Sequence, residues 1–269
     1  MSVAVTGAER IAEAFESARA EGRRAALMPY LMAGYPDLDR SREIARAYVD
    51  GGADLIELGI PFSDPLADGP VIHAADVAAL AAGVKMEDAL GVARQVANEI
   101  PVVVMCYVNV ILARGLERFA DMLLAVGASG LIVPDLPLEE APATLAALDA
   151  RGVALVPLVA PTTPDARLAQ IGACARGFLY AVSVTGTTGE RAANDGALPG
   201  ILARARAHTD VPVAVGFGIG TPEQATAAAQ AGADGVIVGS RLVRAAGEAE
   251  APADEVRALV SAFAAALAA

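Results

Sequence analysis

The sequence has few of the residues that carry covalent or metal chemistry in enzymes. Its one lysine, Lys85, lies between two helical segments, so no lysine stands in a strand to form a Schiff base with a substrate. The two histidines, His73 and His208, have no second histidine or cysteine at the spacing of metal ligands. Cys106 and Cys174 lie in apolar stretches without CxxC spacing, which predicts two reduced structural thiols.

The chain also lacks the features of secreted, membrane-spanning and nucleic-acid-binding proteins. No basic segment followed by an apolar one begins the sequence, and the longest apolar stretch, residues 101–113, is too short to span a bilayer. Acidic residues outnumber basic ones, 32 to 20, which gives a net charge of -12 and argues against nucleic acid or anionic membranes as partners. We expect a cytoplasmic protein. Because 55% of the residues are hydrophobic, the chain can build a large core.

Short apolar runs alternate with helical patterns along the whole chain. The runs fall at residues 26–32, 55–60, 102–107, 131–133, 154–158, 178–182, 213–215 and 235–238. Strands that are apolar on both faces and are each followed by a helix form parallel sheets, and eight such units in about 250 residues match a (β/α)8 TIM barrel. We therefore expect an α/β protein in which residues 1–269 form a single barrel domain. An open doubly wound sheet is the alternative, but no G-x-G-x-x-G follows the first strand.

Two helices near the start of the chain can be predicted in more detail. Residues 10–20 precede the first strand and place Ile11, Phe15 and Ala18 on one face. We expect this extra N-terminal helix to cover the bottom of the barrel. Asp39 is predicted to cap the helix that follows the first strand.

The stretch from residue 55 to residue 70 carries two carboxyl groups in unlike surroundings. Glu57 lies inside an apolar run, where a charge is costly unless the protein uses or pairs it. Period-2 alternation places Glu57 on the same face as Leu55 and Gly59. If that face is the barrel interior, Gly59 leaves space above Glu57, and burial raises the pKa of Glu57. Asp68 follows in a Pro/Gly loop, where we expect better hydration and an ionised carboxylate. Such a pair can divide the roles of acid and base.

Each acid also has a structural interpretation. Glu57 would form a salt bridge if a buried Arg or Lys faced it, although no other predicted strand contains one. Asp68 alone would be a turn residue that bonds to its own backbone. A metal site made of Asp54, Asp64 and Asp68 is disfavoured, because the spacing is not that of an EF-hand and prolines constrain the loop.

The last three strands end in glycine-rich segments, at residues 183–189, 216–220 and 238–240. Barrels bind phosphate with backbone N–H groups after the seventh and eighth strands and at the start of a short helix. Glycine lets the backbone approach the phosphate oxygens closely. We therefore expect the substrate to be a small phosphate ester, acted on by general acid–base catalysis. Because these segments contain little positive charge, N–H groups and a helix dipole would bind the phosphate.

Several motifs resemble the tryptophan synthase alpha chain family over nearly the whole length of the chain. The most specific is E-L-G-I-P-F-S-D-P-L-A-D-G-P at residues 57–70. The others are P-Y-L-M-A-G-Y-P-D at 29–37, M-C-Y-V-N at 105–109, P-D-L-P at 134–137, T-G-T-T-G at 185–189, G-F-G-I at 216–219 and V-G-S at 238–240. The resemblance implies a retro-aldol cleavage of indole-3-glycerol phosphate to indole and glyceraldehyde 3-phosphate.

The resemblance also implies a role for each matching residue. Glu57 would be the general acid and base, which protonates the indole C3 and takes the proton of the substrate hydroxyl. Asp68 would hold the indole N–H and stabilise the positively charged indolenine. Six further residues match the family's substrate-binding positions: Tyr180 near the reacting centre, Thr188 on a mobile lid where it touches Asp68 on closure, and Gly189, Gly218, Gly239 and Ser240 around the phosphate.

A partner and a cofactor outside this chain follow from the same resemblance. The family's alpha chain docks on a beta chain in an alpha2-beta2 heterotetramer, and indole passes to the beta chain through a tunnel. The beta chain carries pyridoxal phosphate, and we expect no cofactor in the present chain. Two loops, at residues 61–70 and 185–189, resemble the family's mobile lids. One departure is Val184, which stands where some members have an arginine in the second lid. It puts the ordering of that lid in question and leaves the reaction unaffected.

Two other functions fit parts of the pattern. Another phosphate-binding barrel isomerase or synthase would share the late glycines but not the motif D-P-L-A-D-G-P. A non-catalytic subunit that only activates a beta chain is expected to have lost one of the two acids, and both are present.

Overall fold

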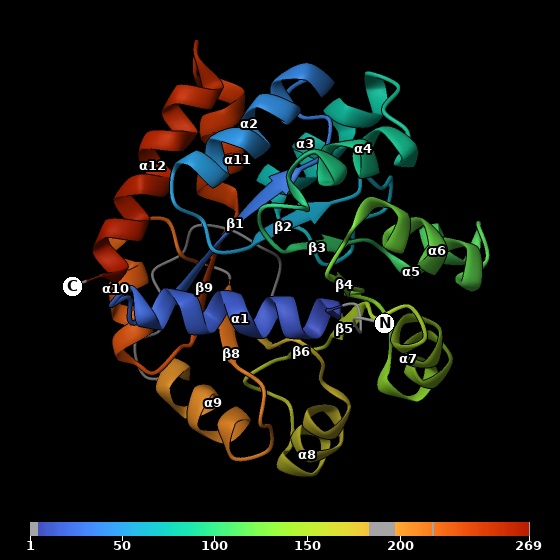
Figure 1. The fold of residues 1–269 in the computed structure, drawn as a ribbon, viewed down its shortest axis with the longest axis vertical. Helices are drawn as coiled ribbons and strands as arrows, with labels where there is room; N and C mark the ends of the chain where they lie inside the picture. Colours follow the sequence, from blue (N-terminus) through green and yellow to red (C-terminus); the bar gives the residue numbers. More distant parts are fainter. Residues whose placement is uncertain (1–4, 183–196, 217, 269) are drawn as a thin grey trace.

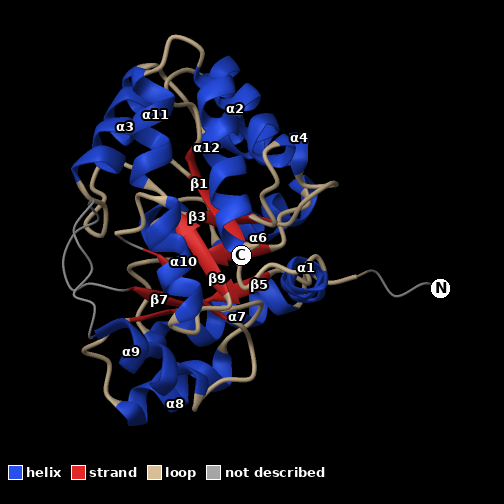
Figure 2. Cartoon of the chain, turned by 90° about the vertical axis from the view of Figure 1, so that its left-hand side faces the viewer, coloured by secondary structure: helices blue, strands red, loops and turns tan. Residues whose placement is uncertain are grey.

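The computed structural model of the chain describes residues 5–182, 197–216 and 218–268. Nine parallel strands of these residues form one sheet in the order β5-β4-β3-β2-β1-β9-β8-β7-β6. They are β1 (Ala26–Met32), β2 (Ile56–Gly59), β3 (Val102–Met105), β4 (Gly130–Ile132), β5 (Ala154–Val156), β6 (Leu158–Val159), β7 (Leu179–Val182), β8 (Val213–Gly216) and β9 (Gly235–Val238). Helices surround the strands on the outside (Figures 1 and 2).

The sheet closes into a barrel at Pro157. β5 pairs with β4 and β6 pairs with β7, and Pro157 alone separates β5 from β6. Because proline has no N–H to donate, the fifth strand of the barrel is divided into two short pieces. The Pro157 carbonyl still accepts a hydrogen bond from the Tyr180 N–H, at 3.0 Å. The predicted (β/α)8 barrel is therefore confirmed, with its fifth strand interrupted.

The helices alternate with the strands, and several extra ones lie between them. They are α1 (Gly7–Ala20), α2 (Leu38–Asp50), α3 (Pro70–Ala81), α4 (Met86–Val96), α5 (Val108–Leu112), α6 (Leu116–Val126), the 3-10 helix η1 (Leu138–Glu140), α7 (Ala141–Asp149), α8 (Asp165–Cys174), α9 (Ala197–Arg206), α10 (Pro222–Gln230), α11 (Ser240–Glu248) and α12 (Pro252–Leu267). In the part of the chain that the structure describes, no helix is long and apolar enough to cross a membrane.

α1 covers the N-terminal end of the barrel, as predicted. Its Ile11 and Phe15 are buried in the same apolar cluster as the interior residues Leu55 and Phe178. The rings of Phe15 and Phe178 have centroids 6.0 Å apart. Figure 1 shows α1 crossing in front of the strands, and Figure 2 shows it at one end of them. Because side chains fill this end, a substrate can reach the interior only from the C-terminal ends of the strands.

The start of α2 differs from the prediction. Its N-cap is Asp37, whose side chain accepts a hydrogen bond from the Arg40 N–H at 2.9 Å. An N-cap oxygen reaches the N–H group two or three residues further on, and the chain enters the helix early enough for Asp37 to do so. Asp39 instead lies in the first turn, where its negative charge interacts favourably with the helix dipole. The predicted cap was therefore wrong by two residues.

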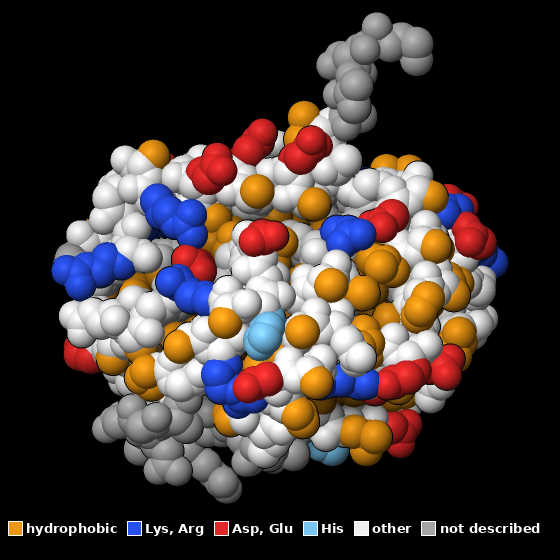
Figure 3. All heavy atoms as spheres, turned by 90° about the horizontal axis from the view of Figure 1, so that it is seen from below, with side chains coloured by type: hydrophobic (Ala, Val, Ile, Leu, Met, Phe, Trp, Pro, Cys, Tyr) orange, Lys and Arg blue, Asp and Glu red, His pale blue; other side chains and the backbone are white. Residues whose placement is uncertain are grey.

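Basic and acidic side chains lie next to one another on the surface. Figure 3 views the side on which α8 and α9 lie and shows red and blue side chains interspersed with apolar ones. Ion pairs connect α9 with its neighbours: Arg204 pairs with Asp165 of α8 at 2.7 Å, and Arg206 pairs with Asp234 at 2.8 Å. The described part of this face carries both signs of charge, in keeping with the net charge of -12 and with the expectation that nucleic acid is not a partner.

Candidate active site

Glu57 lies on β2 and points into the barrel. Its Cα partners in the parallel register are Tyr30 on β1 and Val103 on β3, and Val103 belongs to the interior cluster. Glu57 is 2% exposed, and its Oε2 has no hydrogen-bond partner among the described residues. Burial, followed by the negative charge of Asp68, raises the pKa of Glu57 to about 8. No cation contributes to this shift, so the salt-bridge interpretation fails for the described residues, and the carboxyl group holds a proton at neutral pH.

The space above Glu57 is filled by Tyr30, contrary to expectation. A Cβ atom at Gly59 would lie 2.0 Å from the Tyr30 hydroxyl oxygen, so residue 59 is glycine because this ring approaches it. The Tyr30 hydroxyl is buried without a hydrogen-bond partner among the described residues. Burial and the nearby charges of Asp68, Asp76 and Glu57 all raise its pKa. The phenol therefore faces the acids of the site.

Asp68 lies in the loop between β2 and α3 and is tied to Tyr107. The Tyr107 hydroxyl donates a hydrogen bond to Asp68 Oδ2 at 2.9 Å and accepts one from the Ala67 N–H at 3.0 Å. Burial raises the pKa of Asp68 to about 6, although Tyr107 and His73 act to lower it. The side chain is less hydrated than expected, because burial is the largest cause of its raised pKa. It is still mostly ionised at pH 7, so the predicted contrast with Glu57 remains.

Tyr180 lies on β7 near the same end of the barrel. It is buried, and a Cβ atom at Gly216 would lie 2.1 Å from its hydroxyl oxygen. Burial, and then the charges of Glu57 and Asp68, raise the pKa of Tyr180 well above its ordinary value. The structure thus brings this predicted residue to the two predicted acids.

The predicted phosphate-binding residues that the structure describes lie after two adjacent strands. β8 pairs with β9, so the segments that follow them are neighbours. Gly218 has a φ of 83°, which favours glycine. Gly239 is the N-cap of α11, and Ser240 is the first residue of that helix. The N–H groups at the start of α11 have no partner within the helix and can bind an anion.

Three residues discussed for the second lid cannot be placed. Val184, Thr188 and Gly189 lie outside the described residues. The contact predicted between Thr188 and Asp68 stays a prediction.

The sequence analysis predicted no chemical role for three residues of the site. Tyr30 and Tyr107 stand in the quoted motifs at 29–37 and 105–109, but only the structure shows that their hydroxyls face the acids. Asp76, on α3, is 1% exposed and accepts a hydrogen bond from the Phe62 N–H at 3.1 Å. Burial raises its pKa to about 7. A signal for Asp76 was present, because it is an acid four residues after Ile72 on the apolar face of a helix.

The three aspartates considered for a metal site do not come together. Asp54 precedes β2 and forms an ion pair with Arg23 at 2.7 Å, whereas Asp68 follows β2 at the other end of the barrel. Among the described residues, no group of three or more His, Cys, Asp and Glu side chains is arranged to hold a metal ion.

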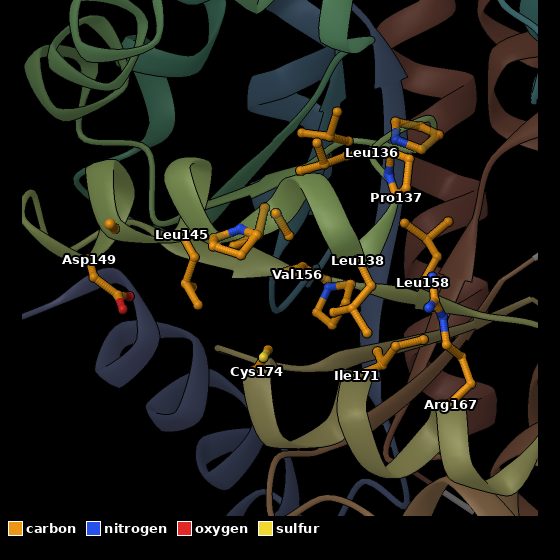
Figure 4. Close-up of a pocket in the computed structure, with 17 residues that line it drawn as sticks. Leu136, Pro137, Leu138, Leu145, Asp149, Val156, Leu158, Arg167, Ile171 and Cys174 are labelled. Atoms are coloured by element: carbon orange, nitrogen blue, oxygen red, sulfur yellow. The ribbon is translucent and has the colours of Figure 1, made fainter.

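An apolar cavity lies between α7 and α8, away from the predicted site residues (Figure 4). Its volume is about 480 Å³, and its lining is mostly apolar, with Leu145 and Ile171 pointing into it from the two helices. Cys174, one of the two free cysteines, also lines it. Ion pairs between Glu139 and Arg167 and between Asp149 and Arg176 link the two sides. None of the predicted site residues lines this cavity, so we place the chemistry at the barrel mouth.

Proteins similar to this chain share one description. A family model for the tryptophan synthase alpha chain matches residues 15–268. A tryptophan synthase alpha chain of Synechococcus elongatus is 49% identical over 235 residues, which are 87% of this chain and 88% of the relative. Another, from Methanosarcina mazei, is 46% identical over 241 residues, which are 90% of this chain and 88% of the relative. A solved structure of Mycobacterium tuberculosis tryptophan synthase has a TM-score of 0.90 at 42% identity and covers 97% of this chain and 98% of its own.

Proposed function

This chain belongs to the tryptophan synthase alpha chain family, and we propose that it carries out the family's reaction at the mouth of the barrel. The reaction is the retro-aldol cleavage of indole-3-glycerol phosphate to indole and glyceraldehyde 3-phosphate. The observation that carries the proposal is the pair of unlike acids. Glu57 is buried with a pKa of about 8, and Asp68 is held by Tyr107 with a pKa of about 6.

Glu57 is the general acid and base of the proposed mechanism. Because its pKa is about 8, it holds a proton at neutral pH that it can give to C3 of the indole ring. The ring then becomes a positively charged indolenine. The resulting Glu57 carboxylate takes the proton of the adjacent substrate hydroxyl, the C–C bond breaks, and its electron pair returns to the ring. Indole and an aldehyde are released, and Glu57 has regained its proton.

Asp68 stabilises the charged intermediate. An ionised carboxylate accepts a hydrogen bond from the indole N–H, and this bond strengthens as positive charge develops on the ring. Tyr107 supports the role because its hydroxyl bonds to one carboxylate oxygen, Oδ2, at 2.9 Å and thereby orients the group. Tyr180 would contact the substrate near the reacting carbon, opposite these acids.

Backbone N–H groups would hold the phosphate of the substrate. Gly218 and Gly239 lie after β8 and β9, and Ser240 begins α11, whose N-terminus favours a negative charge. Gly189 would complete the site. Thr188 would close over Asp68, so that water is excluded during the reaction.

The chain acts as an alpha subunit that passes indole to a beta chain, in an alpha2-beta2 heterotetramer. Leu66, in the loop before α3, and Leu112, on α5, are 84% and 64% exposed near the mouth of the barrel. Exposed apolar side chains of this size favour a protein partner at this face. Pyridoxal phosphate would be bound by the beta chain, with no cofactor in the present chain. The expected location is the cytoplasm.

Indole formation from indole-3-glycerol phosphate, with and without added beta chain, tests the proposal. We expect indole release in both cases. A related phosphate-binding barrel isomerase would release none under either condition. A purely activating subunit would also release none, but it would raise the rate at which the beta chain makes tryptophan from added indole. Either result would contradict the proposed reaction.

A further inference from the structure

Asp76 is a buried acid to which the mechanism above gives no role. It lies on α3 with Ile72 and Ala79, in the row of side chains that faces the protein interior. Its Oδ1 accepts the hydrogen bond from the Phe62 N–H at 3.1 Å, while its Oδ2 has no partner among the described residues. A buried carboxyl group with only one bonded oxygen is costly. Alanine, which occupies positions 75 and 79 of the same helix, would fill the row without this cost.

A continuous set of contacts leads from Asp76 to Asp68. The Phe62 ring stacks on the Tyr107 ring, with centroids 5.1 Å apart and planes inclined by 24°. The Tyr107 hydroxyl in turn bonds to Asp68 Oδ2 and to the Ala67 N–H. The β2–α3 loop is thus tied near its start by Asp76 and near its end by Tyr107. A shift of the backbone at residue 62 would move the ring that packs on Tyr107.

We propose that Asp76 is a positioning residue for the reaction: by accepting the Phe62 N–H, it fixes the β2–α3 loop so that Asp68 faces the indole N–H. This inference rests on the proposed function, because Asp76 acts through Asp68. The acceptor oxygen Oδ1, rather than the negative charge, does the positioning. A functional role of this kind explains why a costly acid occupies an interior position of α3.

Two substitutions of Asp76 separate the acceptor from the charge. Asp76→Asn keeps an acceptor oxygen at nearly the same place, whereas Asp76→Ala removes the acceptor and the charge together. With the beta chain present, we expect Asp76→Ala to lower kcat/KM for indole release at least about tenfold and Asp76→Asn to stay within about threefold of wild type. The matched control is Asp234→Ala. Asp234 accepts the Val213 N–H at 2.9 Å at the opposite end of the barrel, so its loss should lower the Tm without lowering kcat/KM.

A fluorescent probe at residue 62 measures the loop itself, without activity. The chain contains five tyrosines but no tryptophan, so Phe62→Trp places a single tryptophan on the loop, which can be excited selectively at the red edge of the absorption band. We expect acrylamide to quench this tryptophan equally in the parent and in the Asp76→Asn background, and more strongly in the Asp76→Ala background, because the loop is released. Circular dichroism at the same temperature establishes that each variant is folded.

The inference is overturned if Asp76→Ala keeps a kcat/KM for indole release within about twofold of wild type. It is also overturned if Asp76→Asn lowers kcat/KM as much as Asp76→Ala does. If Asp234→Ala lowered kcat/KM as much as Asp76→Ala, the inference would also be overturned, since the lower activity would then follow from reduced stability in general. If the wild-type chain releases no indole, the proposed function fails. The quenching experiment then decides the role of Asp76 alone, and equal quenching in all three forms contradicts it.

Discussion

Glu57 can exchange a proton with the substrate only as a carboxyl group. In Glu57→Gln the amide neither gives nor takes a proton at neutral pH, so we expect turnover to fall by at least about 10²-fold. The rate of indole release from indole-3-glycerol phosphate measures this loss. The variant should still fold and bind the beta chain, because the amide has nearly the same size. Near-normal turnover would contradict the assigned role.

Asp68→Asn tests the role of the second acid. The asparagine keeps an oxygen that can accept the Tyr107 hydroxyl bond, which is 2.9 Å in the structure, but it has no charge to stabilise the indolenine. We expect a nearly inactive enzyme. A variant that binds a substrate analogue normally and turns over at the wild-type rate would show that Asp68 does not serve the indole N–H.

The raised pKa of Glu57 also makes a prediction about stability. An unfolded Glu57 ionises near its ordinary pKa of 4.5, whereas the folded one ionises near 8. Between these values the unfolded state binds fewer protons at this group, so the contribution of Glu57 to wild-type stability falls as pH rises. Glu57→Gln removes this penalty. We expect the variant to gain stability relative to wild type between pH 4.5 and pH 8, by up to about 1.4 kcal/mol per pH unit.

Urea unfolding of both proteins at several pH values across this range measures the difference. A constant difference would mean that Glu57 ionises alike in the folded and unfolded states. The pairing of lower activity with higher stability would identify Glu57 as a residue kept for function.

At the scale of single elements, the strands could be predicted because their apolar runs are local signals. The interruption at Pro157 could not, since it depends on which neighbour each half of the strand pairs with. α5 was missed because its residues, 108–112, continue an apolar run that begins as β3. The cap of α2 at Asp37 was missed because two aspartates, residues 37 and 39, are both suitable cap residues.

A substitution in β2 tests how closely the Tyr30 ring of β1 packs against Gly59. In Gly59→Ala the new methyl group would lie 2.0 Å from the Tyr30 hydroxyl oxygen, so the ring has to move. We expect a loss of about 1–3 kcal/mol in the free energy of unfolding, and lower activity, because Tyr30 faces the acids. The matched control is Gly91→Ala in α4, where a Cβ atom would meet nothing within 4 Å apart from its chain neighbours and the backbone of its own helix. There the alanine should stabilise the helix by about 0.5–1 kcal/mol. Urea unfolding and indole release measure both variants, and equal effects would contradict the close packing.

At the scale of the whole molecule, the sequence predicted which segments meet at the barrel mouth but not the contacts between their side chains. Parallel strands bring their C-terminal ends to one edge, so Glu57 and Gly239 could be placed together from order alone. The bonds of Asp68 to Tyr107 and of Phe62 to Asp76 depend on the path of a Pro-rich loop. Neither spacing nor composition determines such a path.

The two ends of the barrel should respond differently to substitution. Phe15 is 1% exposed and packs into the interior from α1. Phe15→Ala should lower the free energy of unfolding by about 3–5 kcal/mol, because it leaves a cavity. We expect kcat for indole release to be unchanged at a temperature where the variant is folded, since the chemistry is at the other end. A large fall in kcat in the folded variant would contradict this separation.

The helix α1 leaves the barrel open at one end only. Because Phe15 and Phe178 fill the barrel below Glu57, no molecule can travel through it from end to end. Substrate and both products have to use the same opening, so a beta chain that covered it would act on the entry of the substrate and on the release of both products. Indole would then pass to the beta chain rather than to solvent. The order in which the two products leave would depend on the whole complex rather than on this chain alone.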